Sequence, residues 1–166
     1  ALDANTTASN NTAIGYASLS ANTTGAQNTA VGSFALDAVT TADNNTAIGY
    51  LAGTGCTTGT ANVFVGDLAG QTLTTASRCV FIGNTSGAIN TVTGDKNTGV
   101  GDNSLRNVSS GAFNTAVGSE SLMENTTASS NTAFGYQSLK ANTTGHSNVA
   151  VGANALDANT TADNNT

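Results

Sequence analysis

The chain contains neither proline nor tryptophan, and charged residues make up only 8% of it and aromatic residues 5%. Such a composition is not that of an ordinary globular domain of 166 residues. Disorder is disfavoured as well, because disordered segments are usually highly charged and poor in β-branched residues, whereas Val, Ile and Thr recur here in register. Asn and Thr together form about a third of the chain, a bias typical of repeats.

Basic residues are equally scarce: four Lys and Arg against ten Asp and Glu, for a net charge of −6 and a pI near 4.2. This balance argues against nucleic acids and anionic membrane surfaces as partners, since both attract basic patches. No apolar run has the length of a transmembrane helix, and no signal peptide is visible. The two cysteines, Cys56 and Cys79, occupy different repeat positions two coils apart, which is a poor geometry for a disulfide.

The phrase Asn-Thr-Ala-Ile-Gly divides the chain into nine coils. Consecutive coils start 17 residues apart, except for one extra residue between Cys79 and Asn97. We number the positions of a coil from this starting residue, so that Asn11 holds position 1 and Gly15 position 5. The coils start at Asn11, Asn28, Asn45, Asn62, Cys79, Asn97, Asn114, Asn131 and Asn148.

Position 5 is glycine in all nine coils, which indicates a turn with positive φ or a close approach of two backbones. Position 15, almost always Gly or Ala, marks a second corner. The pattern predicts strands at positions 1 to 4 and at about 7 to 10, hence an all-β parallel solenoid (β-roll) of about nine coils, about 43 Å long at ~4.8 Å per coil. The turn glycines are Gly15, Gly32, Gly49, Gly66, Gly83, Gly101, Gly118, Gly135 and Gly152.

In most coils, a small side chain at position 3 accompanies a large one at position 9, or the reverse. Position 9 is mostly Leu, but it is Gly53, Gly70 and Gly87 in three middle coils, two of which carry Phe instead of Ala at position 3. Such an exchange is expected if both positions fill one interior, and Gly53 would then rely on Phe64 of the next coil. The predicted solenoid core is Leu19, Leu36, Phe64, Phe81, Leu105, Leu122, Leu139 and Leu156.

With position 3 inward, the always apolar position 4 points outward as a ladder of on the order of 400 Å², as large as the biggest apolar patch of a typical monomer. Its burial would contribute about 15–25 kcal/mol, so we expect lateral association into a symmetric homo-oligomer. The alternative reverses the two faces. The predicted oligomer-interface ladder is Ile14, Val31, Ile48, Val65, Ile82, Val100, Val117, Phe134 and Val151.

Residues 11–15 and 148–152 match the strand phrase Ser-Val-Ala-Ile-Gly, and the chain as a whole resembles the head repeats of trimeric autotransporter adhesins (a YadA-like left-handed parallel β-roll). The resemblance implies a parallel homotrimer at the cell surface that binds host matrix, cells or other surfaces. The repeats of that family are about 14 residues long, however, and similar arrays also resemble phage tail fibres.

Residues 1–12 and 155–166 differ at one position and both lie mid-coil. We therefore expect a single repeat array over 1–166, cut from a longer fibre, or units that stack end to end into a filament.

No residues are arranged for catalysis, a cofactor or a metal. His146 is the only histidine and is expected at the surface. The aspartates fall in turns, the position-1 Asn side chains are expected to form an amide ladder, and Tyr16, Tyr50 and Tyr136 to cover the edge of the roll. The prediction is a non-catalytic, structural or adhesive segment of an extracellular fibre, whose partners are its own copies and a surface ligand. The alternatives are a phage tail-fibre shaft and, from the Thr-Thr pairs, an ice-binding solenoid.

Overall fold

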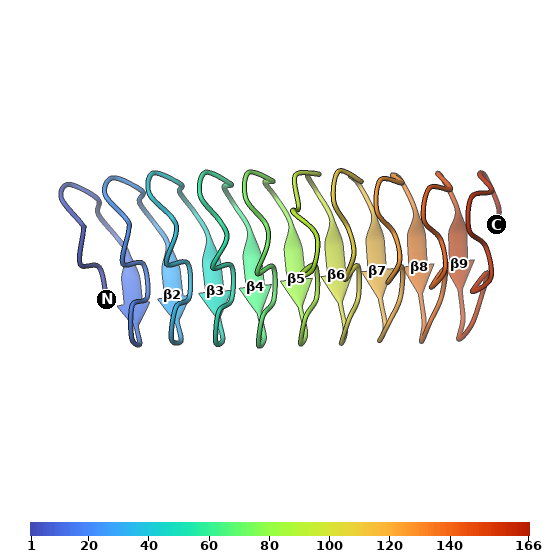
Figure 1. The fold of residues 1–166 in the computed structure, drawn as a ribbon, viewed down its shortest axis with the longest axis horizontal. Coiled ribbons are helices and arrows are strands. Elements are labelled where there is room, and N and C mark those ends of the chain that lie inside the picture. Colours follow the sequence, from blue (N-terminus) through green and yellow to red (C-terminus); the bar gives the residue numbers. More distant parts are fainter.

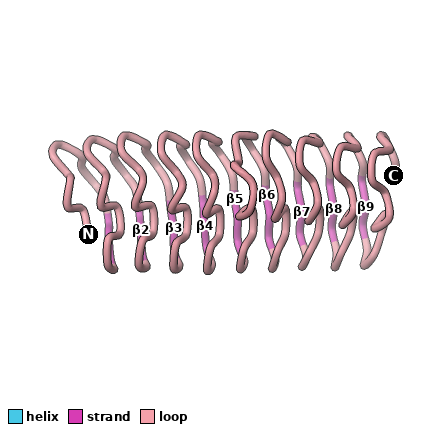
Figure 2. Tube along the Cα trace, viewed as in Figure 1, coloured by secondary structure: helices cyan, strands magenta, loops and turns pink.

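The computed structural model describes residues 1–166 as one rod of stacked coils (Figure 1). It contains no helix, and its only strands are nine segments of three residues each, drawn in magenta along one side of the rod in Figure 2. They are β1 (Thr12–Ile14), β2 (Thr29–Val31), β3 (Thr46–Ile48), β4 (Val63–Val65), β5 (Val80–Ile82), β6 (Thr98–Val100), β7 (Thr115–Val117), β8 (Thr132–Phe134) and β9 (Val149–Val151).

The nine strands form one parallel sheet in chain order, β1 to β9. Every strand pairs with the next at equivalent repeat positions, so that Ala13 lies beside Ala30 and Ile14 beside Val31. The fold is therefore the predicted all-β parallel solenoid, with about eight turns. The extra residue of the fifth coil is accommodated in its return segment, and Val80 still pairs with Thr98.

The expected second strand at positions 7 to 10 is wrong. These residues form turns, because the backbone at positions 7 and 9 has positive φ, as at Ala17 (53°) and Leu19 (48°). Successive coils still hydrogen-bond there: the Leu19 N–H donates to the Ala35 carbonyl at 3.0 Å. In this turn two consecutive side chains are buried, as at Ser18 and Leu19, which an extended strand with alternating faces would not allow.

Positions 3 and 9 both point into the rod. Phe64, Phe81 and five of the position-9 leucines are completely buried, and Leu156 in the last coil is half-buried. A Cβ at Gly53 would lie 2.5 Å from the Phe64 ring, and one at Gly70 would lie 2.2 Å from it. A Cβ at Gly87 would lie 2.7 Å from the Phe81 ring. The absent position-9 side chains are therefore replaced by phenylalanine rings, and Phe64 fills the space of two coils.

Candidate functional site

The outer face of the sheet carries an apolar side chain in every coil. Side chains at positions 2 and 4 point away from the interior, and four position-4 residues are strongly exposed: Ile14 (60%), Ile48 (43%), Phe134 (53%) and Val151 (73%). The other five, Val31, Val65, Ile82, Val100 and Val117, are half-buried. The structure therefore brings the whole predicted ladder to one surface. We call the position-4 ladder and the position-2 column together the outer strand face.

The position-2 column consists of Thr in six strands and Val in three, namely Val63, Val80 and Val149. No charged residue occurs in any of the nine strands. The sheet is parallel and in register, so these two columns repeat at the strand spacing of about 4.8 Å along the rod. The outer strand face is thus regular, uncharged and largely apolar.

Position-5 glycines end each strand and set how closely the coils approach. Their φ angles lie between 124° for Gly152 and 142° for Gly49. A Cβ at Gly118 would lie 2.4 Å from the carbonyl oxygen of Gly135 in the next coil, whereas one at Gly152 would meet nothing within 4 Å. Both predicted reasons for glycine, positive φ and close backbone approach, hold together in the other eight coils.

The Asn side chains at position 1 join neighbouring coils mainly through the backbone. The Asn28 Nδ2 donates to the Ala42 carbonyl at 2.7 Å, and its Oδ1 accepts the Asn45 N–H at 2.9 Å. An amide-to-amide bond from Asn45 Nδ2 to Asn28 Oδ1 is longer, at 3.3 Å. These buried amides therefore satisfy backbone groups that would otherwise be unpaired, which is a structural role.

The Thr-Thr pairs divide into two columns with different roles. At position 13 the Thr23 hydroxyl donates to the Thr40 carbonyl at 3.0 Å, and that oxygen also accepts the N–H groups of Thr23 and Thr24. At position 14 the side chains, such as Thr24 and Thr127, are exposed and make no hydrogen bond within the chain. Only one hydroxyl is therefore free at the surface in the pairs Thr23–Thr24, Thr57–Thr58, Thr126–Thr127 and Thr143–Thr144.

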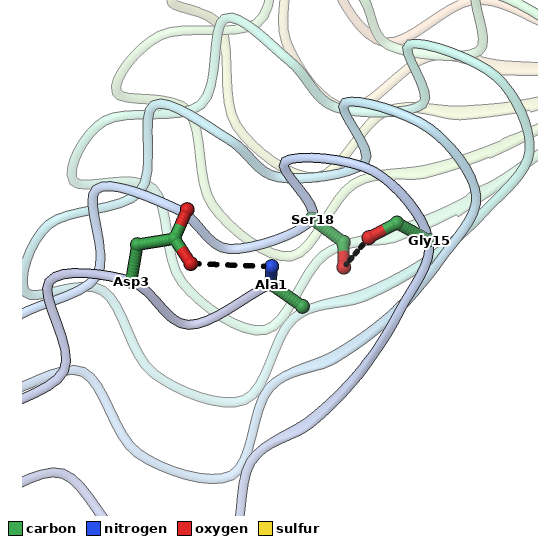
Figure 3. Close-up of polar contacts among 4 residues, drawn as sticks. All are labelled: Ala1, Asp3, Gly15 and Ser18. Carbon is green, nitrogen blue, oxygen red and sulfur yellow. Dashed lines mark hydrogen bonds and ion pairs between the residues drawn. The ribbon is translucent and has the colours of Figure 1, made fainter.

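Some of the buried serine hydroxyls in the turn after a strand are bonded locally, whereas those of Ser121 and Ser138 have no hydrogen-bond partner. Figure 3 shows the Ser18 Oγ donating to the Gly15 carbonyl at 3.1 Å, beside the exposed contact between the Ala1 ammonium group and Asp3 at 3.4 Å. The position-8 column, Ser or Ala throughout, is buried in eight coils and half-buried at Ala155. The sequence reading missed this column, although its restriction to two small residue types was a usable signal.

Both cysteines are free and buried. Burial raises the pKa of the Cys56 thiol to about 12 and that of Cys79 to about 11. Cys79 holds position 1, where its Sγ contacts the Gly94 carbonyl at 3.5 Å in place of an Asn amide. Neutral thiols in such surroundings are unreactive, so they act as core residues.

Titratable groups are dispersed over the surface. His146 is exposed, and its Nδ1 accepts the Ser129 N–H at 3.0 Å. Lys140 lies 2.7 Å from Glu120, and this hydrogen bond lowers the pKa of Glu120 and raises that of Lys140. No three His, Cys, Asp or Glu side chains gather in one place, and there is no ligand-sized cavity. The molecule also has no helix long and apolar enough to cross a membrane.

Tyr16, Tyr50 and Tyr136 lie at position 6, directly after the turn glycine, and are 75%, 53% and 51% exposed. They come two residues after a strand of the outer strand face and are largely open to solvent. Comparisons of the chain with protein-family models, with curated proteins and with solved structures found no match.

Proposed function

We propose that this chain is a structural segment of an extracellular fibrous protein whose copies associate side by side through the outer strand face, as a parallel homotrimer. The observation that carries the proposal is the uncharged face along all nine strands, with Ile14, Ile48, Phe134 and Val151 exposed by 43 to 73%. Contiguous apolar surfaces of this kind mark interaction sites in soluble proteins.

The energetic argument favours association over exposure. Burying a Val or Ile side chain fully is worth roughly 1.5–3 kcal/mol, and nine position-4 residues share the face. The backbone N–H and C=O groups of the strands are already hydrogen-bonded within the sheet. A partner copy therefore does not need to supply backbone hydrogen bonds along this face. Association there would add apolar burial without leaving polar groups unpaired.

The interior supports a mechanical role. Its columns are filled by Leu, Phe, Ala, Ser and Asn side chains at full burial, so no internal space is available for a ligand. Whatever the protein contacts must be bound on the outside of a rod. Adhesion to a host matrix or another surface is the function that we propose for the assembled fibre.

Native mass spectrometry and sedimentation velocity test the association. We expect an assembly of three times the chain mass of 16.3 kDa. Aspartate at position 4, in the double variant Ile48→Asp/Val117→Asp, should yield monomers, because it places charges within the contact.

The matched control is Thr58→Asp/Thr127→Asp, which adds the same charges in the same coils at the exposed position 14. This control should keep the wild-type mass. A monomeric wild-type chain would refute the proposal, as would an assembly that both variants leave intact. Adhesion is then measured as binding of the assembled wild type to matrix-coated surfaces, with the monomeric variant for comparison.

A further inference from the structure

Three coils differ from the others at the rim of the outer strand face. Each carries Tyr at position 6, two residues after an Ile or Phe at position 4: Ile14 with Tyr16, Ile48 with Tyr50, and Phe134 with Tyr136. These six side chains are 43 to 75% exposed. The remaining coils have Ser, Asp, Asn or Ala at position 6. The rod therefore has three large apolar spots, in its first, third and eighth coils.

The spacing of these spots is not periodic. From Tyr16 to Tyr50 is two coils, and from Tyr50 to Tyr136 is five coils. If two parallel copies are aligned without offset, all three spots coincide. An offset of two, five or seven coils brings only one pair together, and every other offset brings none. An antiparallel alignment matches at most two.

We infer that Tyr16, Tyr50 and Tyr136 set the register between copies of this chain, holding them parallel and without offset. The inference rests on the self-association proposed above, and these three residues give that association a single alignment. A ladder of Val and Ile repeating every coil stabilises any whole-coil offset almost equally, and such repeating surfaces need a distinguishing element to specify one alignment. Tyr suits this role because it combines large contact area with low conformational entropy, and it is enriched among residues that dominate interfaces.

The charged residues of the position-6 column fit a location at the edge of the proposed contact. Asp67 and Asp102 also hold position 6 and are exposed. Copies in register bring equivalent aspartates to the same level, which costs little where solvent screens them at the edge of a contact. An offset of one coil would instead bring Tyr50 level with Asp67. The column thus disfavours the offset of one coil.

The size of the contact points the same way. The position-4 ladder alone offers on the order of 400 Å², about half of the ~800 Å² that each partner contributes to a standard interface. The position-2 and position-6 columns flank it on either side and supply further area. A second copy seated only on the ladder would leave Tyr16, with 75% of its surface exposed, beside the contact without using it.

Cysteine cross-linking tests the register on the assembled protein. Ser33→Cys places a thiol in the position-6 column of the second coil, and Cys56 and Cys79 are buried and do not interfere. A short thiol cross-linker should join Ser33→Cys chains to each other in high yield. Mixed with Asp67→Cys chains, they should give no product joining residues 33 and 67, which requires an offset of two coils.

The same measurements are then made with Tyr16→Ser/Tyr50→Ser/Tyr136→Ser. Two equally populated registers would halve the yield of the 33–33 product, so we expect a fall of at least about two-fold and the appearance of the 33–67 product. The control Thr24→Ser/Thr58→Ser/Thr144→Ser changes position 14 of the same three coils and should match the wild type. If the triple Tyr variant dissociates, Tyr136→Ser alone should show the same shift to a smaller degree.

An assembled wild type that gives the 33–67 product, or a Tyr variant with unchanged products, would overturn the register inference while leaving lateral association intact. A monomeric wild type, seen by native mass, would instead remove the proposed function itself.

Discussion

The central coils and the flanking coils fill the same backbone in two ways. In the flanks, small Ala116 at position 3 faces large Leu122 at position 9, and both are completely buried. In the centre, Phe64 at position 3 lies against Gly70 at position 9. The φ angle at position 9 is positive in both regions, 48° at Leu122 and 60° at Gly70. Side-chain volume is thus exchanged between two positions while the course of the chain is kept.

A second column changes in the same direction. At the corner formed by position 12, the flanks carry buried asparagines, such as Asn125 and Asn142, which donate to backbone carbonyls at 3.1 and 2.9 Å. The second to sixth coils have apolar residues in the corresponding place, all completely buried: Val39, Cys56, Leu73, Val92 and Val108. With the stacked rings of Phe64 and Phe81, 6.4 Å apart, the centre is apolar at this corner, where the flanks have a column of amides.

The repeat therefore depends on backbone spacing and on total interior volume, and the type of side chain that fills the interior can vary. In a solenoid each coil contacts only its neighbours, so stability is approximately a sum of local terms. The apolar centre is therefore expected to unfold last. The buried side chains of the centre and of the flanks can be exchanged by substitution to test this.

Exchanging the central filling should have the largest effect on stability. Phe64→Ala removes the ring that occupies the space of two glycines, and we expect a loss of about 3–5 kcal/mol in the free energy of unfolding. Gly70→Leu alone should also destabilise, because its Cβ would lie 2.2 Å from that ring. The double variant recreates the flanking arrangement in the fourth coil but leaves the space beside Gly53 open, so it should recover part of the loss. Urea unfolding at one fixed protein concentration measures all three.

The reverse exchange, Ala116→Phe/Leu122→Gly in a flanking coil, is the matched control and should also be tolerated better than either single change. Additive losses in both double variants would show that positions 3 and 9 do not share one space.

Position 5 is the feature that both regions keep, so its effect should be equal in the two. In central Gly66→Ala and flanking Gly118→Ala, the new Cβ would lie 2.6 and 2.4 Å from the next carbonyl oxygen, at φ of 134° and 132°. We expect each to lose about 2–5 kcal/mol from overpacking and backbone strain together. Gly152→Ala has φ of 124° but no neighbour within 4 Å, and should lose only about 1–2 kcal/mol. Equal losses at all three sites would mean that strain alone explains the glycines.

The sequence was sufficient for the solenoid because its dominant signals repeat with the coil. Glycine at position 5 and the exchange between Phe64 and Gly70 each follow from one local constraint, and both can be read without knowing the coil's path. The turns at positions 7 to 10 could not be read in this way. An apolar residue such as Leu19 gives no sign that its backbone will have a φ of 48°, since that conformation is imposed by stacking against the next coil and opposes the residue's own preference.

The outer strand face was partly predictable for a similar reason. Position 4 is uniformly apolar, which indicates an interface, whereas the division of the Thr pairs depends on which hydroxyl reaches the next carbonyl. That choice is made by the return segment, where Thr23 bonds to the Thr40 carbonyl and Thr24 remains exposed. Two neighbouring identical residues cannot be distinguished by composition, and only the three-dimensional path separates them.

The smallest predicted effect concerns the two thiols of the apolar centre. Between pH 9 and about 11, an unfolded chain loses thiol protons that the folded chain retains, because burial raises the pKa of Cys56 from 9.0 to about 12 and that of Cys79 from 9.0 to about 11. Stability present below pH 9 is therefore lost as the pH rises through this range, by on the order of 1–1.5 kcal/mol for each thiol at pH 10.

The control for this loss comes from the repeat itself. Cys56→Val/Cys79→Asn installs the residues that other coils carry at the same positions, Val39 and Val108 at position 12 and Asn elsewhere at position 1. The two chains differ only at these two positions, so the difference between their urea-unfolding curves at pH 8 and pH 10 isolates the thiols. The wild type should lose more stability than the variant over that interval. An equal loss of stability in both chains between pH 8 and pH 10 would mean that the two thiols are not shielded from solvent. The contrast between an apolar centre and amide-lined flanks would then not hold at these two positions.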